Sequence, residues 1–196
     1  IIDGIPIAAI AEERLNRVKH YAGFPQLAIT ECLRIGNLSW RDIDVVAIGR
    51  DQSANYVRKV LYSVKRPNMT RNFAHILRRR NNLEDIRQLI LSNSGELSDS
   101  LRFQVEYVEH HLAHTASSYF ISPWEHAIGI TVDGSGDFVS CMMSVCEGST
   151  ITTHKKIHVP NSLGNFYSAI CQLIGFDEYG DEGKVMGLAP FGEDTY

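Results

Sequence analysis

The chain has 196 residues, of which 44% are hydrophobic and 21% are charged, and its formal net charge is −4. This length and composition are typical of a globular domain or of part of a larger one, and the slight negative charge gives no basic field for a DNA partner. No apolar run reaches the roughly 18 residues of a membrane span, and the four cysteines contain no C-x-x-C pair, so we expect a cytoplasmic protein with reduced thiols and no membrane partner.

The first half of the chain predicts an α/β protein with a helical excursion. The opening "IIDGIPIAAI" predicts a β-hairpin with a turn at Asp3–Gly4, and residues 26–35 have helical spacing. Ser39 is expected to cap a short helical turn before a strand over 44–49. Residues 51–100 are polar and basic, and we expect them to be helical, with breaks at Pro67 and Gly95 and with basic clusters at 65–66 and 78–80 on a solvated face.

The second half continues the alternation of strands and helices. A strand over 103–111 runs into the histidine segment, and the helix that follows is rich in small residues and ends near Pro123. Three strands follow between 126 and 160, joined by turns at "DGSGD" and "EGST". A helix over 161–176 is expected to begin with Asn161 or Ser162 as its cap, and a glycine-interrupted helix covers 181–190. This order predicts the α/β class.

The segment "VEHHLAHTASSYF" contains three histidines within five positions. His110 and His114 are four residues apart, so on a helix they share one face and both imidazoles can reach one point. Imidazole is a common ligand of zinc and iron. His111 points about 100° away, which makes it a weaker candidate and predicts that His111→Ala is tolerated. The alternative is a partly buried helix whose histidines are structural.

The segment "ITVDGSGDFVS" adds a carboxylate at the end of an apolar strand. Asp133 fits a mixed nitrogen and oxygen site for a divalent metal. Backbone N–H groups of Gly134, Ser135 and Gly136 can approach an anion such as a phosphate, so these residues are candidates for cofactor binding. Asp137 is the candidate catalytic residue, through a substrate hydroxyl or a second metal. The alternative is a plain hairpin turn, because Asp and Gly are common turn residues.

Two further clusters are candidates for binding an anion. "EGKVMGLAP" places Lys184 near the N-terminus of a predicted helix, where a phosphate binds readily, and Glu182 is a second candidate for contacts on the nucleotide side. The other cluster follows the first predicted strand and has an ordinary surface as its alternative interpretation. It consists of Glu12, Arg14, Arg17 and Lys19.

Four segments together resemble the NodU/CmcH family of O-carbamoyltransferases, in its N-terminal Kae1-like domain. They are "AAIAEERLNRVKHYAGFP", "VEHHLAHTASSYF", "ITVDGSGD" and "EGKVMGLAPFG". The resemblance implies half of an actin-like ATPase (ribonuclease H-like) fold, with a mixed β-sheet flanked by helices. It also implies that His110, His114 and Asp133 hold a divalent metal against the phosphates of an adenylate. Iron is the expected metal, with magnesium, manganese and zinc as alternatives.

The resemblance further implies an ATP-dependent biosynthetic transferase. Carbamoyl phosphate and ATP give a carbamoyl-adenylate, which a separate YrdC-like domain makes, and the carbamoyl group then passes to a hydroxyl of a small-molecule acceptor. Residues 1–196 are expected to be a fragment of the Kae1-like domain that lacks the first strand with its His-Asp-Ser-Ala-type segment, the second half with a fourth, aspartate ligand, and the YrdC-like domain. The fragment is therefore expected to be inactive alone, to pair with the remaining polypeptide and to self-associate.

Two other functions stay open at this point. One is that of a relative of the tRNA threonylcarbamoyl transferases, which also have an H-x-x-x-H metal pair. The other is a non-catalytic binding module, in which the histidines are structural and residues 51–100 dock a partner.

Overall fold

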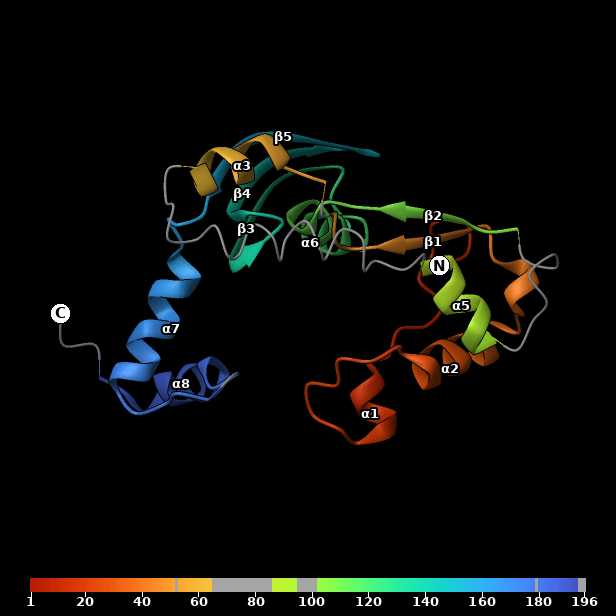
Figure 1. Cartoon of the computed structure of the whole chain (residues 1–196), viewed down its shortest axis with the longest axis horizontal. Helices are drawn as coiled ribbons and strands as arrows, with labels where there is room; N and C mark the ends of the chain where they lie inside the picture. Colours follow the sequence, from red (N-terminus) through yellow and green to blue (C-terminus); the bar gives the residue numbers. More distant parts are fainter. Residues whose placement is uncertain (52, 65–85, 95–101, 179, 194–196) are drawn as a thin grey trace. The chain divides into compact units, whose positions relative to one another are not determined.

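The computed structural model describes residues 1–51, 53–64, 86–94, 102–178 and 180–193 (Figure 1). The chain divides into two compact units. Unit 1 combines Ile1–Ile48 with Val60–Tyr107, and unit 2 combines Gly49–Lys59 with Val108–Tyr196. Both units contain helices and strands, so the predicted α/β class is confirmed.

Unit 1 is built on two short parallel strands, β1 (Val45–Ile48) and β2 (Gln104–Tyr107). Its helices are α1 (Glu12–Asn16), α2 (Gln26–Gly36), the 3-10 turn η1 (Trp40–Asp42) and α5 (Ile86–Ser94). The core forms where α5, η1 and the two strands meet around Ile90 and Phe103. As predicted, Ser39 caps η1, because its hydroxyl accepts the N–H of Arg41.

The N-terminal hairpin forms only in part. Asp3 and Gly4 have positive φ angles, as the predicted turn requires, and Ile2 and Ile5 form one bridge. The strand predicted after this turn is wrong, since residues 6–10 are not in a strand. A single pair of short strands is marginal in water, and here the pairing ends after one bridge.

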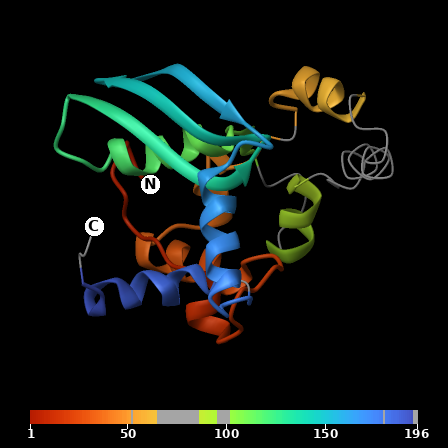
Figure 2. The ribbon, with the colours of Figure 1, turned by 90° about the vertical axis from the view of Figure 1, so that its left-hand side faces the viewer.

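Unit 2 is built on three antiparallel strands in the order β3 (His126–Gly136), β4 (Val139–Glu147) and β5 (Thr150–His158). The helix α6 (His110–Tyr119) packs on one face of this sheet, because its His111 and Thr115 are buried against β3. The helix α7 (Leu163–Leu173) starts beside the end of β3, and α8 (Glu182–Leu188) and the 3-10 turn η4 (Ala189–Phe191) follow (Figure 2).

The described strands pair in two sets, and the mixed sheet that the family resemblance implies remains a prediction. The parallel pair β1–β2 and the antiparallel strands β3–β4–β5 are separate sheets of different units. Local pairing explains unit 2, because β3, β4 and β5 are joined by turns of two residues each and pair as consecutive hairpins. The second of these turns, at Gly148, is the predicted "EGST" turn.

The helical character predicted for residues 51–100 holds where the structure describes them. Helix α3 (Tyr56–Val64) and helix α5 both lie in this stretch. The predicted breaks at Pro67 and Gly95 and the basic clusters at 65–66 and 78–80 lie outside the described residues. Within the part of the chain that the structure describes, no helix has the length and apolar character needed to cross a membrane.

Candidate metal centre

Helix α6 brings the first two candidate ligands together because of where it begins. Glu109 caps the helix, since its carboxylate accepts the N–H of Leu112 at 3.0 Å, one of the first-turn donors that lack a partner inside the helix. Lys156 lies 3.5 Å from the same carboxylate and holds it in place. The helix therefore starts at His110, and the spacing of four residues places His114 on the same face one turn later.

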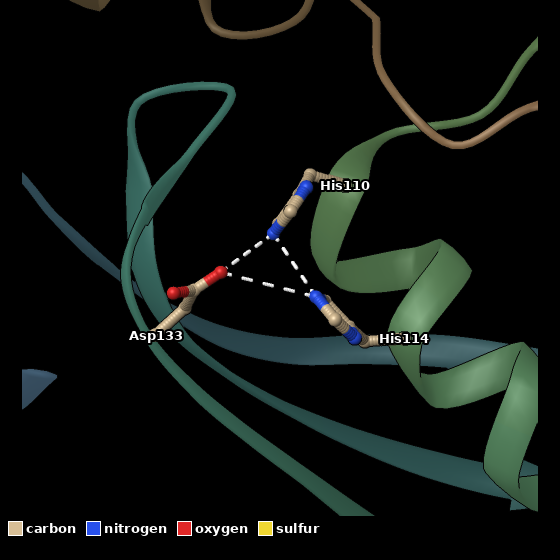
Figure 3. Close-up of side chains that lie close together, drawn as sticks. All are labelled: His110, His114 and Asp133. Atoms are coloured by element: carbon tan, nitrogen blue, oxygen red, sulfur yellow. Dashed lines mark hydrogen bonds and ion pairs between the residues drawn. The ribbon is translucent and has the colours of Figure 1, made fainter. Parts of the chain in front are cut away.

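Two imidazoles and one carboxylate converge on a single point beside this helix (Figure 3). The Nε2 atom of His110 lies 2.7 Å from Oδ2 of Asp133 and 3.0 Å from Nε2 of His114. The Nε2 atom of His114 lies 3.8 Å from the same Asp133 oxygen. We call His110, His114 and Asp133 the triad.

A bulge in β3 aims Asp133 at helix α6. Val132 pairs with Cys141 and Gly136 pairs with Val139, so three residues of β3 lie opposite a single residue of β4. Such a bulge bends a strand and redirects a side chain, which is a frequent feature near functional sites. Asp133, the first residue of the bulge, is thereby the carboxylate that reaches the two imidazoles.

Two glycines permit the close packing around the triad. A Cβ atom on Gly136 would lie 1.9 Å from Cδ2 of His110, so only a glycine fits beneath this ring. A Cβ atom on Gly164, in the first turn of α7, would lie 2.5 Å from the carbonyl carbon of Asp133. Any side chain at either position would displace a member of the triad.

The electrostatics of the triad favour an ionised carboxylate. Burial alone would raise the pKa of Asp133, but the hydrogen bond with His110, the N–H of Gly134 and the two nearby imidazoles together hold this pKa below its usual range. Side-chain exposures of 26% for His110, 54% for His114 and 41% for Asp133 leave the triad open to solvent. An ion can therefore reach it from the bulk solution.

The donor set fits a divalent metal. Two imidazole nitrogens and one carboxylate oxygen suit zinc, iron or manganese. Metal–ligand bonds of about 2.1 Å place neighbouring ligand atoms roughly 3.0–3.4 Å apart, and the three separations in the triad bracket this range. Three ligands leave coordination positions open for a substrate oxygen. Metal binding itself remains a prediction.

His111 has a different environment from its two neighbours. Its side chain is fully buried, and its ring bonds to Thr131 at 2.8 Å and to the carbonyl of Val139 at 3.0 Å. The ring therefore faces the sheet and not the triad, as the helical geometry predicted.

Asp137 lies in the turn that joins β3 to β4. The sequence predicted the turn over the whole "DGSGD" segment, but the two turn residues are Asp137 and Phe138, both with positive φ angles. The Oδ2 atom of Asp137 accepts the N–H of His110 at 2.9 Å and that of Asp51 at 2.7 Å. The side-chain amide of Asn55 donates to the Asp137 carbonyl at 3.0 Å. A catalytic role for Asp137 remains a prediction.

Asp51 and Asn55 are the residues of this site that the sequence analysis missed. Asp51 and Asn55 are 86 and 82 residues away from Asp137 in the chain, so no local pattern connects them to it. Both residues also lie in the stretch 51–100, which the sequence predicted to be a helical excursion and not part of the site.

The predicted cofactor-binding residues divide into two groups. Gly134, Ser135 and Gly136 lie in or next to the bulge, and the N–H of Gly134 already donates to Oδ1 of Asp133. Glu182 accepts a hydrogen bond from Ser168, and Lys184 forms an ion pair with Asp181. Helix α8, which carries both, lies at the end of α7 away from β3 (Figures 1 and 2), so the structure does not bring them to the triad.

The cluster after the first predicted strand belongs to unit 1. Glu12 accepts the N–H groups of Leu27 and Ala28, the first-turn donors of α2, at 3.2 and 2.7 Å. Its described contacts therefore join α1 to α2. Ligand binding by Glu12, Arg14, Arg17 and Lys19 remains a prediction.

Comparison with known proteins gives a family match along almost the entire chain. A family model described as "Carbamoyltransferase N-terminus" matches residues 1–195. The chain is 32% identical to an uncharacterized protein of Synechocystis over 99% of its own length. It is 31% identical over 97% of its length to the nodulation protein NolNO of Sinorhizobium fredii, and 39% identical over 44% of its length to the nodulation protein NolO of Bradyrhizobium diazoefficiens.

The matches also define how much of the relatives this chain represents. It spans 32% of the Synechocystis protein and 27% of NolNO. The chain therefore corresponds to less than a third of the length of these curated relatives.

Proposed function

The chain belongs to the carbamoyltransferase family, whose N-terminal region it matches over residues 1–195, and we propose that the protein transfers a carbamoyl group to a hydroxyl group of a small-molecule acceptor. The observation that carries this proposal is the convergence of two imidazoles and a carboxylate within this region. The proposal includes a carbamoyl-adenylate, formed from carbamoyl phosphate and ATP, as the donor.

We also propose that the remaining part of the protein completes the nucleotide site. The chain spans about a third of its relatives, so much of a relative lies outside the matched region. Half of an actin-like ATPase fold agrees with the alternation of strands and helices in the chain. Such a half needs a second half to enclose a nucleotide. The protein is further proposed to act in the cytoplasm.

In this proposal the triad holds a divalent metal, with iron as the expected ion. When bound, the metal supplies positive charge next to the phosphate of the adenylate. The residues of the chain define where this charge lies. His110 and His114 offer Nε2 atoms from one helix face, and Asp133 offers Oδ2 from the bulge. The carboxylate of Asp133 is ionised at neutral pH and able to act as a ligand, and its lowered pKa extends this state to more acidic solution.

The transfer step exchanges one bond for another. The acceptor hydroxyl oxygen forms a bond to the carbamoyl carbon, and the bond between this carbon and the phosphate oxygen breaks. AMP leaves with the electron pair, and the hydroxyl proton is released to solvent. Positive charge near the phosphate stabilises the charge that develops on AMP as it leaves.

The test is a transfer assay with protein expressed from the complete gene. The protein is incubated with radiolabelled carbamoyl phosphate, ATP and a panel of sugars and other hydroxyl compounds. The labelled carbamoylated acceptor and AMP are then measured. We expect labelled product with at least one acceptor, in amounts that match the AMP formed.

Two comparisons make this assay decisive. His114→Ala is expected to abolish transfer, and His154→Ala, which replaces an exposed histidine of β5, is expected to leave it unchanged. Transfer that proceeds without ATP, or at the wild-type rate in His114→Ala, would refute the proposal.

A further inference from the structure

We propose that Asp137 is a positioning residue that fixes the start of helix α6 and thereby the direction of the His110 imidazole. The catalytic role that the sequence suggested for Asp137 remains a prediction, and the positioning role does not depend on it. As far as it concerns the metal, the inference rests on the proposed function. The contact between Asp137 and His110 itself can be tested without any metal.

Asp137 accepts a hydrogen bond from the backbone of His110. His110 is the first residue of α6, so its N–H has no partner inside the helix. Oδ2 of Asp137 accepts this N–H at 2.9 Å. A carboxylate at a helix N-terminus also interacts favourably with the helix dipole. The carboxylate therefore fixes the backbone from which the His110 side chain extends.

Asp137 is itself held in place by its neighbours. Its φ angle is 48°, in the left-handed region of a tight turn, and β3 and β4 flank this turn. The same Oδ2 atom accepts the N–H of Asp51 at 2.7 Å, and Asn55 donates to the Asp137 carbonyl at 3.0 Å. Asp137 is thus fixed by the turn of the sheet and by hydrogen bonds from Asp51 and Asn55.

Asp137 directly follows Gly136 in the chain. Gly136 lies beneath the His110 ring, where a Cβ atom would overlap it. One dipeptide, Gly136–Asp137, therefore contacts the His110 ring through its first residue and the His110 backbone through its second. Loss of the carboxylate would free the backbone while the ring stayed in contact, so the ring would change direction relative to His114 and Asp133.

The first measurement is Co²⁺ binding to protein expressed from the complete gene. Binding is followed by visible absorption, because cobalt spectra report the geometry of the ligands. Asp137→Ala is expected to weaken Co²⁺ binding about 10- to 100-fold, as loss of a supporting residue around a metal commonly does, and to change the absorption bands. Asp137→Asn keeps an oxygen that accepts both N–H groups, so its affinity and spectrum should stay close to wild type. Asp177→Ala removes an exposed carboxylate of the same unit as the matched control.

The second measurement is hydrogen exchange at the His110 amide in the same proteins without metal. The amide should be protected in the wild type, in Asp137→Asn and in Asp177→Ala, and unprotected in Asp137→Ala.

The outcomes separate this inference from the proposed metal site. If the wild type binds no Co²⁺, the metal site fails, and the His110 amide alone decides the inference. Equal protection in the wild type and Asp137→Ala overturns it. Wild-type Co²⁺ binding and spectrum in Asp137→Ala also overturn it. If Asp137→Ala does not fold, the Asp137→Asn variant is decisive. A folded Asp137→Asn protein whose His110 amide is unprotected, or whose Co²⁺ binding is strongly weakened, contradicts a role through hydrogen-bond acceptance.

Discussion

Adjacent histidines have different roles in this protein, and their side-chain surroundings explain why. His110 directs its ring to the triad, whereas the ring of His111 is buried between Thr131 and the carbonyl of Val139. A carbonyl only accepts hydrogen bonds, so Nε2 of His111 donates to Val139. His111 therefore fastens α6 to both β3 and β4.

This arrangement changes the expectation for His111→Ala. The helical geometry of the sequence predicted a tolerated substitution, but the variant would open a cavity and remove the hydrogen bonds of the ring with Thr131 and Val139. We expect the free energy of unfolding to fall by about 3 kcal/mol, measured by urea denaturation. His154→Ala, at an exposed position, should change it little. Equal stability of the two variants would show that the buried ring contributes nothing.

Gly136 gives a second prediction at the scale of single residues. In Gly136→Ala, the new Cβ would overlap the His110 ring, so the ring must leave its present position. We expect a loss of metal affinity of at least about 10-fold, measured by calorimetric titration. The matched control is Gly183→Ala, since a Cβ there meets nothing within 4 Å. Unchanged affinity in Gly136→Ala would mean that the His110 ring does not contribute to the site.

At the scale of elements, the first turn of α7 supports the strand that carries Asp133. Ser162 caps α7 by accepting the N–H of Asn165 at 3.0 Å, and its hydroxyl donates to the carbonyl of Gly134 at 2.8 Å. Its cap role was one of two that the sequence predicted. The same hydroxyl thus joins the helix to the bulge of β3.

Ser162→Ala should therefore affect both the helix and the site. Loss of the cap is expected to lower the free energy of unfolding by about 1 kcal/mol, measured by urea denaturation. Ser149→Ala, in the exposed turn between β4 and β5, is the matched control. An equal effect of the two substitutions would refute a specific contribution of the cap.

Local features of the site could be predicted from the sequence, whereas contacts between distant segments could not. The shared face of His110 and His114 follows from helical periodicity, and the cap of α7 follows from residue type. The bulge at Asp133 could not be predicted, because the glycines that suggested a turn serve close packing with His110 and α7. The contacts of Asp51 and Asn55 with Asp137 join residues that are more than 80 positions apart in the chain.

At the scale of the whole molecule, unit 2 contains a group that makes its stability depend on pH. Burial lowers the pKa of His158, and the positive charges of Arg58 and Lys156 lower it further against the opposite effect of Glu109. The ordinary pKa of a histidine is about 6.5. The folded state therefore binds a proton at His158 less readily than the unfolded state.

The sign of the effect follows from this difference. The contribution of neutral His158 to stability is present above pH of about 6.5 and is lost as the pH falls through the lowered pKa of the folded state. When the pH falls from about 7.5 to about 5.0, a range that spans the ordinary pKa of histidine, His158→Gln should lose less stability than the wild type. The midpoint of thermal unfolding measures this loss. An identical pH dependence in both proteins would contradict the assignment.

The central claim is that the triad is a metal site, and metal content tests it most directly. Protein expressed from the complete gene and its His114→Ala, Asp133→Ala and His154→Ala variants are purified without oxygen and supplied with Fe²⁺, and bound metal is counted by mass spectrometry. The account predicts stoichiometric metal in the wild type and in His154→Ala, and none in the two triad variants. Folded wild-type protein without metal, or equal metal in all four proteins, would contradict it.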